Sequence, residues 1–248
     1  AFIKRNKDNP FFLYLAFDAP HEPYNIDQTA WYEGQETWEP NTKRYASLIT
    51  HMDAAIGRLL NELEQLNLRK NTLIIFASDN GAAIQAPIKI LNCNAGFKGR
   101  KGTLYEGGIR VPFIVNQPGM VPIQTLDNLI YFPDMMPTLA ALAKGTKHLP
   151  KQINGINILP LFYGKQVDTD NRLLYWEFPG KQRAARKGDW KCVTIHPNQP
   201  LELYNLKEDP EETNNLAKKY PRRVKEFDEE MQRMHIPTPN WPQPGEQF

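Results

Sequence analysis

One stretch decides the fold of this chain: Gly99-Arg100-Lys101-Gly102-Thr103-Leu104-Tyr105-Glu106-Gly107-Gly108-Ile109-Arg110-Val111-Pro112. Two further polar clusters lie upstream of it, Ser78-Asp79-Asn80-Gly81 and Ala19-Pro20-His21-Glu22-Pro23. Each cluster lies where a hydrophobic run stops, which is where an open α/β sheet presents its ligand-binding groups. We therefore expect three loop tips to meet at one sheet edge. There they would offer oxygen ligands, an imidazole and an ammonium to a tetrahedral anion.

Length and composition exclude several classes of protein. The 248 residues are enough for one large core with a smaller satellite domain. The net charge of +2, from 30 basic and 28 acidic residues, predicts no affinity for nucleic acid or anionic membranes. No apolar run approaches the roughly 20 residues that span a bilayer, and no signal-type segment opens the sequence. The two cysteines, Cys93 and Cys192, leave disulfide pairing and compartment open.

The first part of the chain has an α/β pattern. Phe11–Phe17 and Thr72–Ala77 are continuous apolar runs typical of buried strands. Between them, apolar residues recur at three- and four-residue spacing over Asn41–Leu68, which predicts a long amphipathic helix. A strand, helix and strand in this order predict a right-handed crossover and a mostly parallel sheet flanked by helices. A third strand is expected over Ile109–Asn116, followed by a short helix over Pro133–Ala143.

The last part of the chain predicts a small α+β domain with an antiparallel sheet. The expected strands are short, with a hairpin at Lys187-Gly188-Asp189; they cover residues 173–178, 183–186, 190–195 and 201–204. A helix is expected over Asn215–Met234. We place the boundary near Val167, which gives domains 1–167 and 168–248.

Asp79 and Asn80 are the candidate metal ligands. A carboxylate and a carboxamide in one turn supply two oxygen donors, which suit Ca²⁺, or Mg²⁺ as the alternative, better than zinc. The other interpretation is an Asn-Gly turn in which Asp79 caps the next segment.

His21, Lys98 and Lys101 are the candidate residues for anion binding and catalysis. His21 lies between two prolines that restrict its backbone, and its ordinary pKa suits donation of a proton to a leaving oxygen. A lysine ammonium beside a metal and an anion stabilises charge on the transferred oxygens. The alternatives are a hydrogen-bonded loop histidine and a solvated basic loop, the latter holding for one of the two lysines. Glu106 would anchor the loop.

Other polar and aromatic residues are less specific. Trp31 and Trp38, in the loop after His21, would stack on a sugar or pack within a lid. For Arg183, Arg186 and His196 an exposed surface position is the better interpretation than a substrate rim. The mixture of basic and aromatic residues matches no nucleic-acid module.

In this order, the three clusters resemble the C-terminal half of a type I, formylglycine-dependent sulfatase of the alkaline-phosphatase-like superfamily. The most specific match is Lys-Gly-x-x-Tyr-Glu-Gly-Gly-x-Arg-Val-Pro over residues 101–112, and Leu-Tyr-Asn-Leu-x-x-Asp-Pro-x-Glu from Leu203 is a second. The resemblance implies Ca²⁺ on Asp79 and Asn80. It implies that His21 contacts the sulfate and protonates the departing alkoxide, and that Lys101, with Lys98 as second choice, is the active-site lysine. The reaction implied is hydrolysis of a sulfate monoester of a sugar or aryl alcohol through a covalent enzyme-sulfate.

The family's nucleophile, a formylglycine made within Cys/Ser-x-Pro-x-Arg, has no match around Cys93 or Cys192. Its remaining metal ligands are also expected upstream of Ala1, so we expect this chain to be inactive alone. A phosphomonoester or phosphonate hydrolase of the same superfamily, or a non-catalytic sulfated-glycan-binding fragment, is the alternative. The resemblance suggests a periplasmic, secreted or lysosomal parent, and it leaves the oligomeric state and the particular sulfate ester open.

Overall fold

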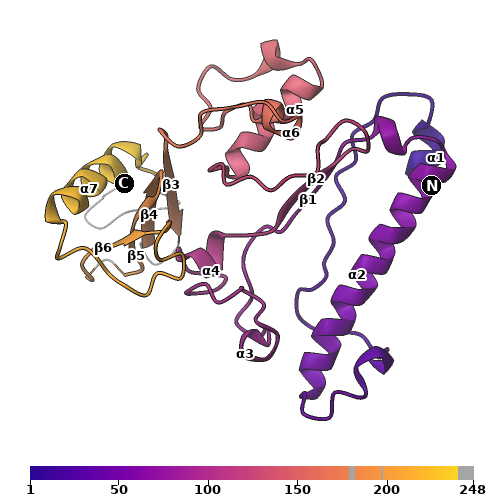
Figure 1. Ribbon diagram of the computed structural model, residues 1–248, viewed down its shortest axis with the longest axis horizontal. Coiled ribbons are helices and arrows are strands. Elements are labelled where there is room, and N and C mark those ends of the chain that lie inside the picture. Colours follow the sequence, from indigo (N-terminus) through magenta and orange to yellow (C-terminus); the bar gives the residue numbers. More distant parts are fainter. Residues whose placement is uncertain (179–181, 197, 240–248) are drawn as a thin grey trace. The chain divides into compact units, whose positions relative to one another are not determined.

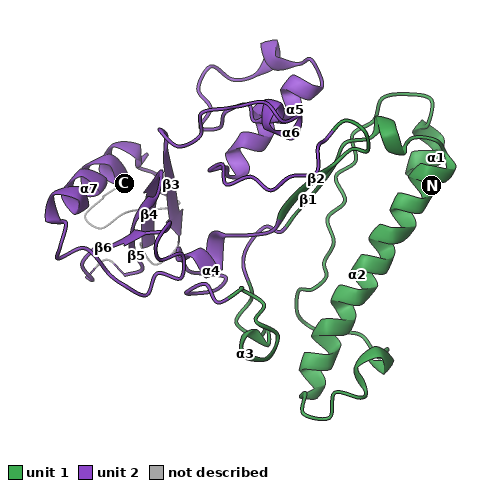
Figure 2. Ribbon diagram, viewed as in Figure 1, with its two compact units in different colours: residues 1–77, 82–95, 113–120 green, residues 78–81, 96–112, 121–248 purple. Residues whose placement is uncertain are grey.

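The structure is a computed structural model that describes residues 1–178, 182–196 and 198–239. It consists of two compact units (Figure 2). Unit 1 comprises residues 1–77, 82–95 and 113–120, and unit 2 comprises residues 78–81, 96–112 and 121–248. Each unit groups segments that pack together, whereas the predicted domains 1–167 and 168–248 are continuous stretches of sequence. The domain boundary near Val167 therefore stays a prediction. No described helix combines the length and the apolar character that a bilayer crossing needs.

The main element of unit 1 is the long helix α2, Pro40–Gln65 (Figure 1). Pro40 occupies the first turn, where a missing N–H costs nothing, and Tyr45, Ala46 and Leu63 are buried on the apolar face. The helix predicted over residues 41–68 is therefore confirmed. The shorter helical segments of unit 1 are α1 (Phe2–Asn6), η1 (Ala30–Tyr32), η2 (Arg69–Asn71) and α3 (Ile88–Leu91).

Unit 1 also contains a two-stranded sheet of β1, Ile74–Ala77, and β2, Phe113–Asn116. The two strands are antiparallel, with Ile74 opposite Asn116 and Ala77 opposite Phe113. The strand expected from Ile109 starts later because Glu106–Ile109 forms a one-turn helix, α4.

The strand predicted over Phe11–Phe17 is wrong. No strand is assigned there, and the side chains of Phe12 and Tyr14 are 70% and 81% exposed. A β-strand is stabilised by the backbone of a neighbouring strand, and within the described residues β1 pairs only with β2. The parallel crossover pairing of Phe11–Phe17 with Thr72–Ala77 is therefore not seen in the described part of the chain.

Unit 2 contains a four-stranded antiparallel sheet in the order β3-β4-β5-β6, as predicted. Its strands are β3 (Leu173–Phe178), β4 (Gln182–Lys187), β5 (Trp190–Thr194) and β6 (Glu202–Asn205). The predicted hairpin joins β4 to β5, and its Gly188 has a φ of 55°, the left-handed conformation that glycine adopts without strain. The other helical segments of this unit are η3 (Phe132–Asp134), α5 (Met135–Leu142), η4 (Thr146–His148) and α6 (Leu159–Phe162).

Two apolar clusters pack other segments of the chain against the four-stranded sheet. Phe227 and Met231 of α7 (Pro221–Met234) pack with Ala185, Cys192 and Leu203. The predicted helix thus exists, but it begins at Pro221 rather than Asn215. A second cluster joins Leu104 and Tyr105 to side chains of β4, β5 and β6, namely Ala184, Val193, Tyr204 and, after β6, Leu206. The motif around residues 101–112 is therefore part of the core of the C-terminal sheet.

Candidate functional site

The Asp79-Asn80 turn directly follows β1 in the sequence. The Ser78 hydroxyl donates a hydrogen bond to the carbonyl of Asn80 at 2.9 Å, which closes the turn. The Asn80 amide nitrogen donates to the carbonyl of Gly81 at 2.9 Å, so the amide oxygen is the atom of this side chain suited to a cation. Asp79 is exposed and Asn80 half-buried. The turn thus holds two hard oxygen donors side by side in the sequence.

This turn is attached to the glycine pair of α4. The Gly81 N–H donates to the Gly108 carbonyl at 2.9 Å, and a Cβ on Gly81 would lie only 1.9 Å from the Gly107 carbonyl oxygen. On the other side, the Gly107 N–H donates to the Lys98 carbonyl at 2.7 Å. Glycines 81 and 107 therefore allow a backbone approach that any side chain would prevent. The structure brings the Asp79-Asn80 turn and the Lys98–Gly108 loop together in unit 2.

Lys98 and Lys101 have different surroundings in this loop. The Lys98 ammonium donates to the Tyr204 hydroxyl at 2.9 Å and lies 3.4 Å from Glu202 Oε2. It also lies 4.0 Å from the centre of the Tyr105 ring. Lys101 is half-buried in the next turn of the loop. Lys98 is thus held by side chains of the four-stranded sheet and of Tyr105, and Lys101 stays the first candidate on the sequence motif.

Glu202 is an ionised carboxylate held by hydrogen-bond donors. Burial opposes its charge, but the Tyr204 and Tyr105 hydroxyls donate to it at 2.6 and 2.7 Å. These bonds and the charge of Lys98 lower the pKa of Glu202 below its ordinary value. Burial and the same carboxylate raise the pKa of Tyr204 and of Tyr105, so both remain donors. The cluster therefore fixes the Lys98 end of the loop.

A buried ionic network lies beneath α4. Lys191 of β5 is fully buried, and its Nζ lies 2.9 Å from Glu106 Oε1 and 2.9 Å from Glu212 Oε1. The Glu106 N–H donates to Glu212 Oε2 at 2.7 Å, so the same carboxylate also caps the start of α4. Arg186 and Arg110 lie 3.7 and 3.8 Å from Glu106 Oε2. Burial raises the pKa of Glu212, although Lys191 opposes this.

This network assigns Glu106 the anchoring role expected from the sequence, and it corrects the surface interpretation of Arg186. The Arg186 side chain is 22% exposed and reaches the Glu106 carboxylate. The surface interpretation is also wrong for Arg183, because its side chain is 23% exposed and lies 3.3 Å from Asp228. His196 is exposed, as expected. Lys191 and Glu212 were missed because they are distant from the motif in the sequence. The available signal was a lysine at an inward position among the apolar residues of β5.

His21 lies in unit 1, in an exposed loop. Its backbone N–H donates to the Asp18 carbonyl at 2.8 Å, and both flanking proline peptides, Ala19-Pro20 and Glu22-Pro23, are cis. The ring Nδ1 lies 2.6 Å from the Glu22 carbonyl. Because a carbonyl only accepts, Nδ1 carries a proton, and Nε2 is the nitrogen suited to exchange a proton with a ligand. The other candidate residues, Asp79, Asn80, Lys98 and Lys101, belong to unit 2.

The donor set around residue 79 fits a hard cation incompletely. Ca²⁺ takes six to eight oxygen ligands, and Asp79 and Asn80 supply oxygens of the right kind. Among the residues that the structure describes, no three His, Cys, Asp or Glu side chains are grouped closely enough to hold a metal ion. The two residues therefore form part of a cation site at most.

Two family models match the chain. "Sulfatase" covers residues 1–146, and "N-sulphoglucosamine sulphohydrolase, C-terminal" covers residues 97–236. A sulfatase of Formosa agariphila is 32% identical over 86% of this chain and 43% of its own length. An N-acetylgalactosamine-6-O-sulfatase of Bacteroides thetaiotaomicron is 30% identical over 92% of this chain and 48% of its own length.

Similarity to solved structures extends over nearly the whole chain. The crystal structure of Ps i-CgsB in complex with k-i-k-neocarrahexaose has a TM-score of 0.85 at 28% identity and covers 98% of this chain and 55% of its own. The structural relatives have the alkaline-phosphatase-like α/β fold, and this chain has that fold in part, with a small antiparallel sheet domain. The chain spans less than half the length of the curated relatives named above. On its sequence and its fold, the chain belongs to the sulfatase family.

Proposed function

We propose that the protein containing this chain hydrolyses a sulfate monoester of a saccharide. Family membership supports the reaction class. The substrate class rests on relatives, among them an N-acetylgalactosamine-6-O-sulfatase and a structure that holds a neocarrahexaose. The observation that carries the proposal is the hydrogen bond from Gly81 to Gly108, because it attaches the predicted cation turn to the loop of the predicted lysine.

Asp79 and Asn80 are proposed to hold Ca²⁺ through their side-chain oxygens, together with ligands from outside these two residues. The cation would supply positive charge for the sulfate oxygens. Mg²⁺ is the alternative cation. It requires near-ideal octahedral geometry, whereas Ca²⁺ accepts six to eight oxygens in variable geometry, so Ca²⁺ is the better match to two adjacent oxygen donors of one turn.

Lys101 is proposed to neutralise charge on the sulfate, and His21 to protonate the departing alkoxide oxygen from Nε2. Lys101 is preferred to Lys98 because it stands directly before Gly102, where the family resemblance has its active-site lysine. The hydrogen bond from His21 Nδ1 to the Glu22 carbonyl orients the ring and makes Nε2 the nitrogen that exchanges a proton with a ligand. The bond between sulfur and the sugar oxygen would break as the sulfuryl group forms a bond to the formylglycine nucleophile that the family resemblance implies, and the protonated sugar hydroxyl would leave.

We further propose that these 248 residues alone turn over no substrate. They contain no Cys/Ser-x-Pro-x-Arg sequence, which is the context of the formylglycine nucleophile that the family resemblance implies. Without a nucleophile, binding and proton transfer lead to no reaction.

The test compares the full-length natural protein with four variants: Asp79→Ala, His21→Ala, Lys101→Ala and Lys98→Ala. Substrates are 4-nitrophenyl sulfate and a sulfated disaccharide, each with its phosphate analogue. We expect Asp79→Ala, His21→Ala and Lys101→Ala to lower kcat/KM at least a hundredfold on the sulfate esters, because each removes charge stabilisation or proton transfer. Lys98→Ala should lower it less than tenfold.

A wild-type protein that is inert towards sulfate esters but cleaves the phosphate or phosphonate analogues would replace this proposal with the alternative hydrolase. Saccharide binding without any turnover would instead favour the non-catalytic alternative. Equal losses in the two lysine variants would contradict the assignment of Lys101.

A further inference from the structure

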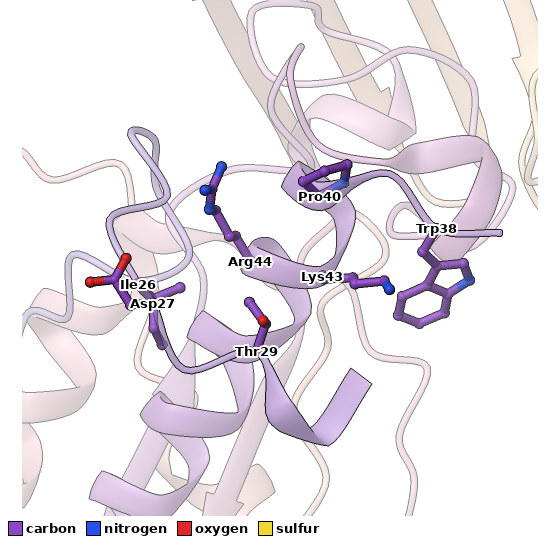
Figure 3. A pocket seen from close by; sticks show the side chains of 7 residues that line it. All are labelled: Ile26, Asp27, Thr29, Trp38, Pro40, Lys43 and Arg44. Atoms are coloured by element: carbon purple, nitrogen blue, oxygen red, sulfur yellow. The ribbon is translucent and has the colours of Figure 1, made fainter. Parts of the chain in front are cut away.

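Two cavities lie side by side in unit 1, at the start of α2. The larger, about 420 Å³, is lined by Glu22, which follows His21 in the chain, and extends to Gln85 and Arg44. The smaller, about 200 Å³, extends from Asp27 to Trp38 and Lys43 (Figure 3). The cavities share Arg44 and the adjacent residues Ile26 and Asp27. Together they form a groove whose lining includes Glu22, the residue that follows the predicted catalytic histidine in the sequence, and nothing in the proposed reaction uses it.

The aromatic part of the groove is Trp38. Its ring stacks on Tyr32, with centroids 5.6 Å apart and an angle of 23° between the planes. The Tyr32 hydroxyl is in turn hydrogen-bonded to Thr50 of α2 at 2.8 Å. The indole is therefore fixed by a second ring and by the helix. A fixed indole offers a flat apolar surface at little entropic cost, which suits a sugar ring.

The charged part of the groove is the pair Lys43 and Arg44. The Lys43 ammonium donates to the Glu33 carbonyl at 3.3 Å, and Figure 3 shows its side chain extending in the direction of Trp38. The Arg44 guanidinium donates to the Asn41 side chain at 3.2 Å, which uses one of its five N–H groups. Both lie in the first turns of a 26-residue helix whose dipole adds positive potential.

Two carboxylates also line the groove, Asp27 in both cavities and Glu22 in the larger one. The smaller cavity therefore has two cations against one anion, and the larger has one cation against two anions. An anionic substituent is favoured beside Lys43 and Arg44. Sugar hydroxyls, which can donate hydrogen bonds, suit the Glu22 and Asp27 carboxylates of the larger cavity. The charge therefore changes from mainly negative at the Glu22 end of the groove to mainly positive at the Trp38 end.

We propose that this groove binds the part of an anionic saccharide that lies beyond the reacting sulfate group. A sugar ring contacts Trp38, and a second acidic substituent, sulfate or carboxylate, is held by Lys43 and Arg44. The inference rests on the proposed sulfatase function and deepens it, because it makes an oligosaccharide with more than one acidic group the preferred substrate.

The test measures binding by isothermal titration calorimetry in EDTA, where a calcium-dependent reaction is switched off. The protein is the full-length natural form, and the probes are a carrageenan hexasaccharide and its desulfated neutral counterpart. We expect Trp38→Ala to weaken binding of both probes at least tenfold. Arg44→Gln and Lys43→Gln should weaken only the sulfated probe, at least fivefold each.

Two matched controls should stay within twofold of the wild type. Trp31→Ala removes an indole that is 56% exposed and lines neither cavity. Arg58→Gln removes an exposed arginine farther along α2. Near-ultraviolet circular dichroism verifies folding, and Trp38→Phe should restore part of the affinity that Trp38→Ala loses.

The inference is overturned if a folded wild type binds neither probe, or if Arg44→Gln and Lys43→Gln bind the sulfated probe as the wild type does. These results are separable from the reaction itself. If the protein hydrolyses simple sulfate esters but the groove variants bind the saccharide probes as the wild type does, only the proposal for the groove is refuted. Groove binding without hydrolysis of any sulfate ester would refute the proposed reaction.

Discussion

The loop of Lys101 and the loop of His21 are held in different ways. In unit 2, the Lys101 loop is bound by α4 and the sheet, and the Glu106, Lys191 and Glu212 side chains beneath it are at most 3% exposed. In unit 1, the His21 loop is exposed, and His21 donates its backbone N–H to the Asp18 carbonyl and its ring Nδ1–H to the Glu22 carbonyl. A buried long-range network therefore lies beneath the loop of one candidate residue, whereas the other candidate lies in an exposed loop with hydrogen bonds to residues near it in the sequence.

The two loops that carry the candidate site residues are therefore stabilised differently, one by a buried ionic network and one by hydrogen bonds near the surface. A buried network positions a residue precisely, but it makes the whole unit sensitive to a single charge change. A local loop tolerates substitution of its neighbours, because little of the fold depends on it.

Lys191→Met should destabilise unit 2 most. The change leaves Glu106 and Glu212 buried without their shared cation, and such a broken pair costs about 3–5 kcal/mol. The measurement is the free energy of unfolding from urea titration at pH 7. Lys207→Met, at an exposed position after β6, is the control and should change it by less than about 0.5 kcal/mol. A loss below about 1 kcal/mol for Lys191→Met would mean that the network does not hold the loop.

Gly81→Ala should separate the cation turn from α4. A Cβ at this position meets the Gly107 carbonyl at 1.9 Å, so backbone must shift, and such overpacking costs about 1–3 kcal/mol. We also expect Ca²⁺ affinity, measured by calorimetry on the full-length protein, to fall at least tenfold.

The matched control for that change is Gly57→Ala in α2, where a Cβ meets nothing within 4 Å. Alanine in a helix interior is better than glycine by about 0.5–1 kcal/mol, so this variant should be slightly more stable than the wild type. If Gly81→Ala behaves in the same way, the close approach of the two segments is refuted.

Glu202→Gln should change how stability depends on pH. The pKa of Glu202 is lower in the folded protein than its ordinary value of 4.5. The stability that its charge contributes is therefore present above the unfolded-state pKa and is lost as pH falls through the folded-state pKa. Urea midpoints from pH 7 down to below pH 4 should fall less steeply in the variant than in the wild type. Parallel pH profiles would contradict an ionised Glu202 held by the two tyrosines.

The reactivity of the two cysteines in the wild-type protein should differ between unit 1 and unit 2. Both are free thiols, Cys93 half-buried in unit 1 and Cys192 fully buried in unit 2. Burial raises the pKa of Cys93, and it raises the pKa of Cys192 to about 12. A disulfide exchange reagent at pH 8 should label Cys93 slowly and Cys192 only in urea. Rapid labelling of Cys192 in the native protein would show that unit 2 opens easily.

Prediction from the sequence worked best where a pattern is local. The period of α2, the hairpin at Gly188 and the short strands of the C-terminal sheet each follow from residues close together in the chain. The run at Phe11–Phe17 shows the limit. Its composition is typical of a buried strand, but a strand exists only where another backbone pairs with it, and no composition encodes that partner.

Within the candidate site, Asp79, Asn80 and Lys101 were identified from turns and from the family motif, whereas Lys191 and Glu212 were not. The side chains of Lys191 and Glu106 are 85 residues apart in sequence, and the burial that makes their pairing important is a property of the folded sheet. The groove at Trp38 lies between these extremes. Its residues are close in sequence, but the shape of a cavity needs coordinates.

The sequence alone determined the family, the candidate chemistry and most of the local elements, because residue types and their spacing carry that information directly. Only the tertiary structure decided that Lys98 is bound by the Glu202 cluster, that a buried lysine supports α4, and that β1 pairs antiparallel with β2. The physical reason is that charge pairing, burial and strand pairing depend on which distant residues meet, and folding brings those residues together.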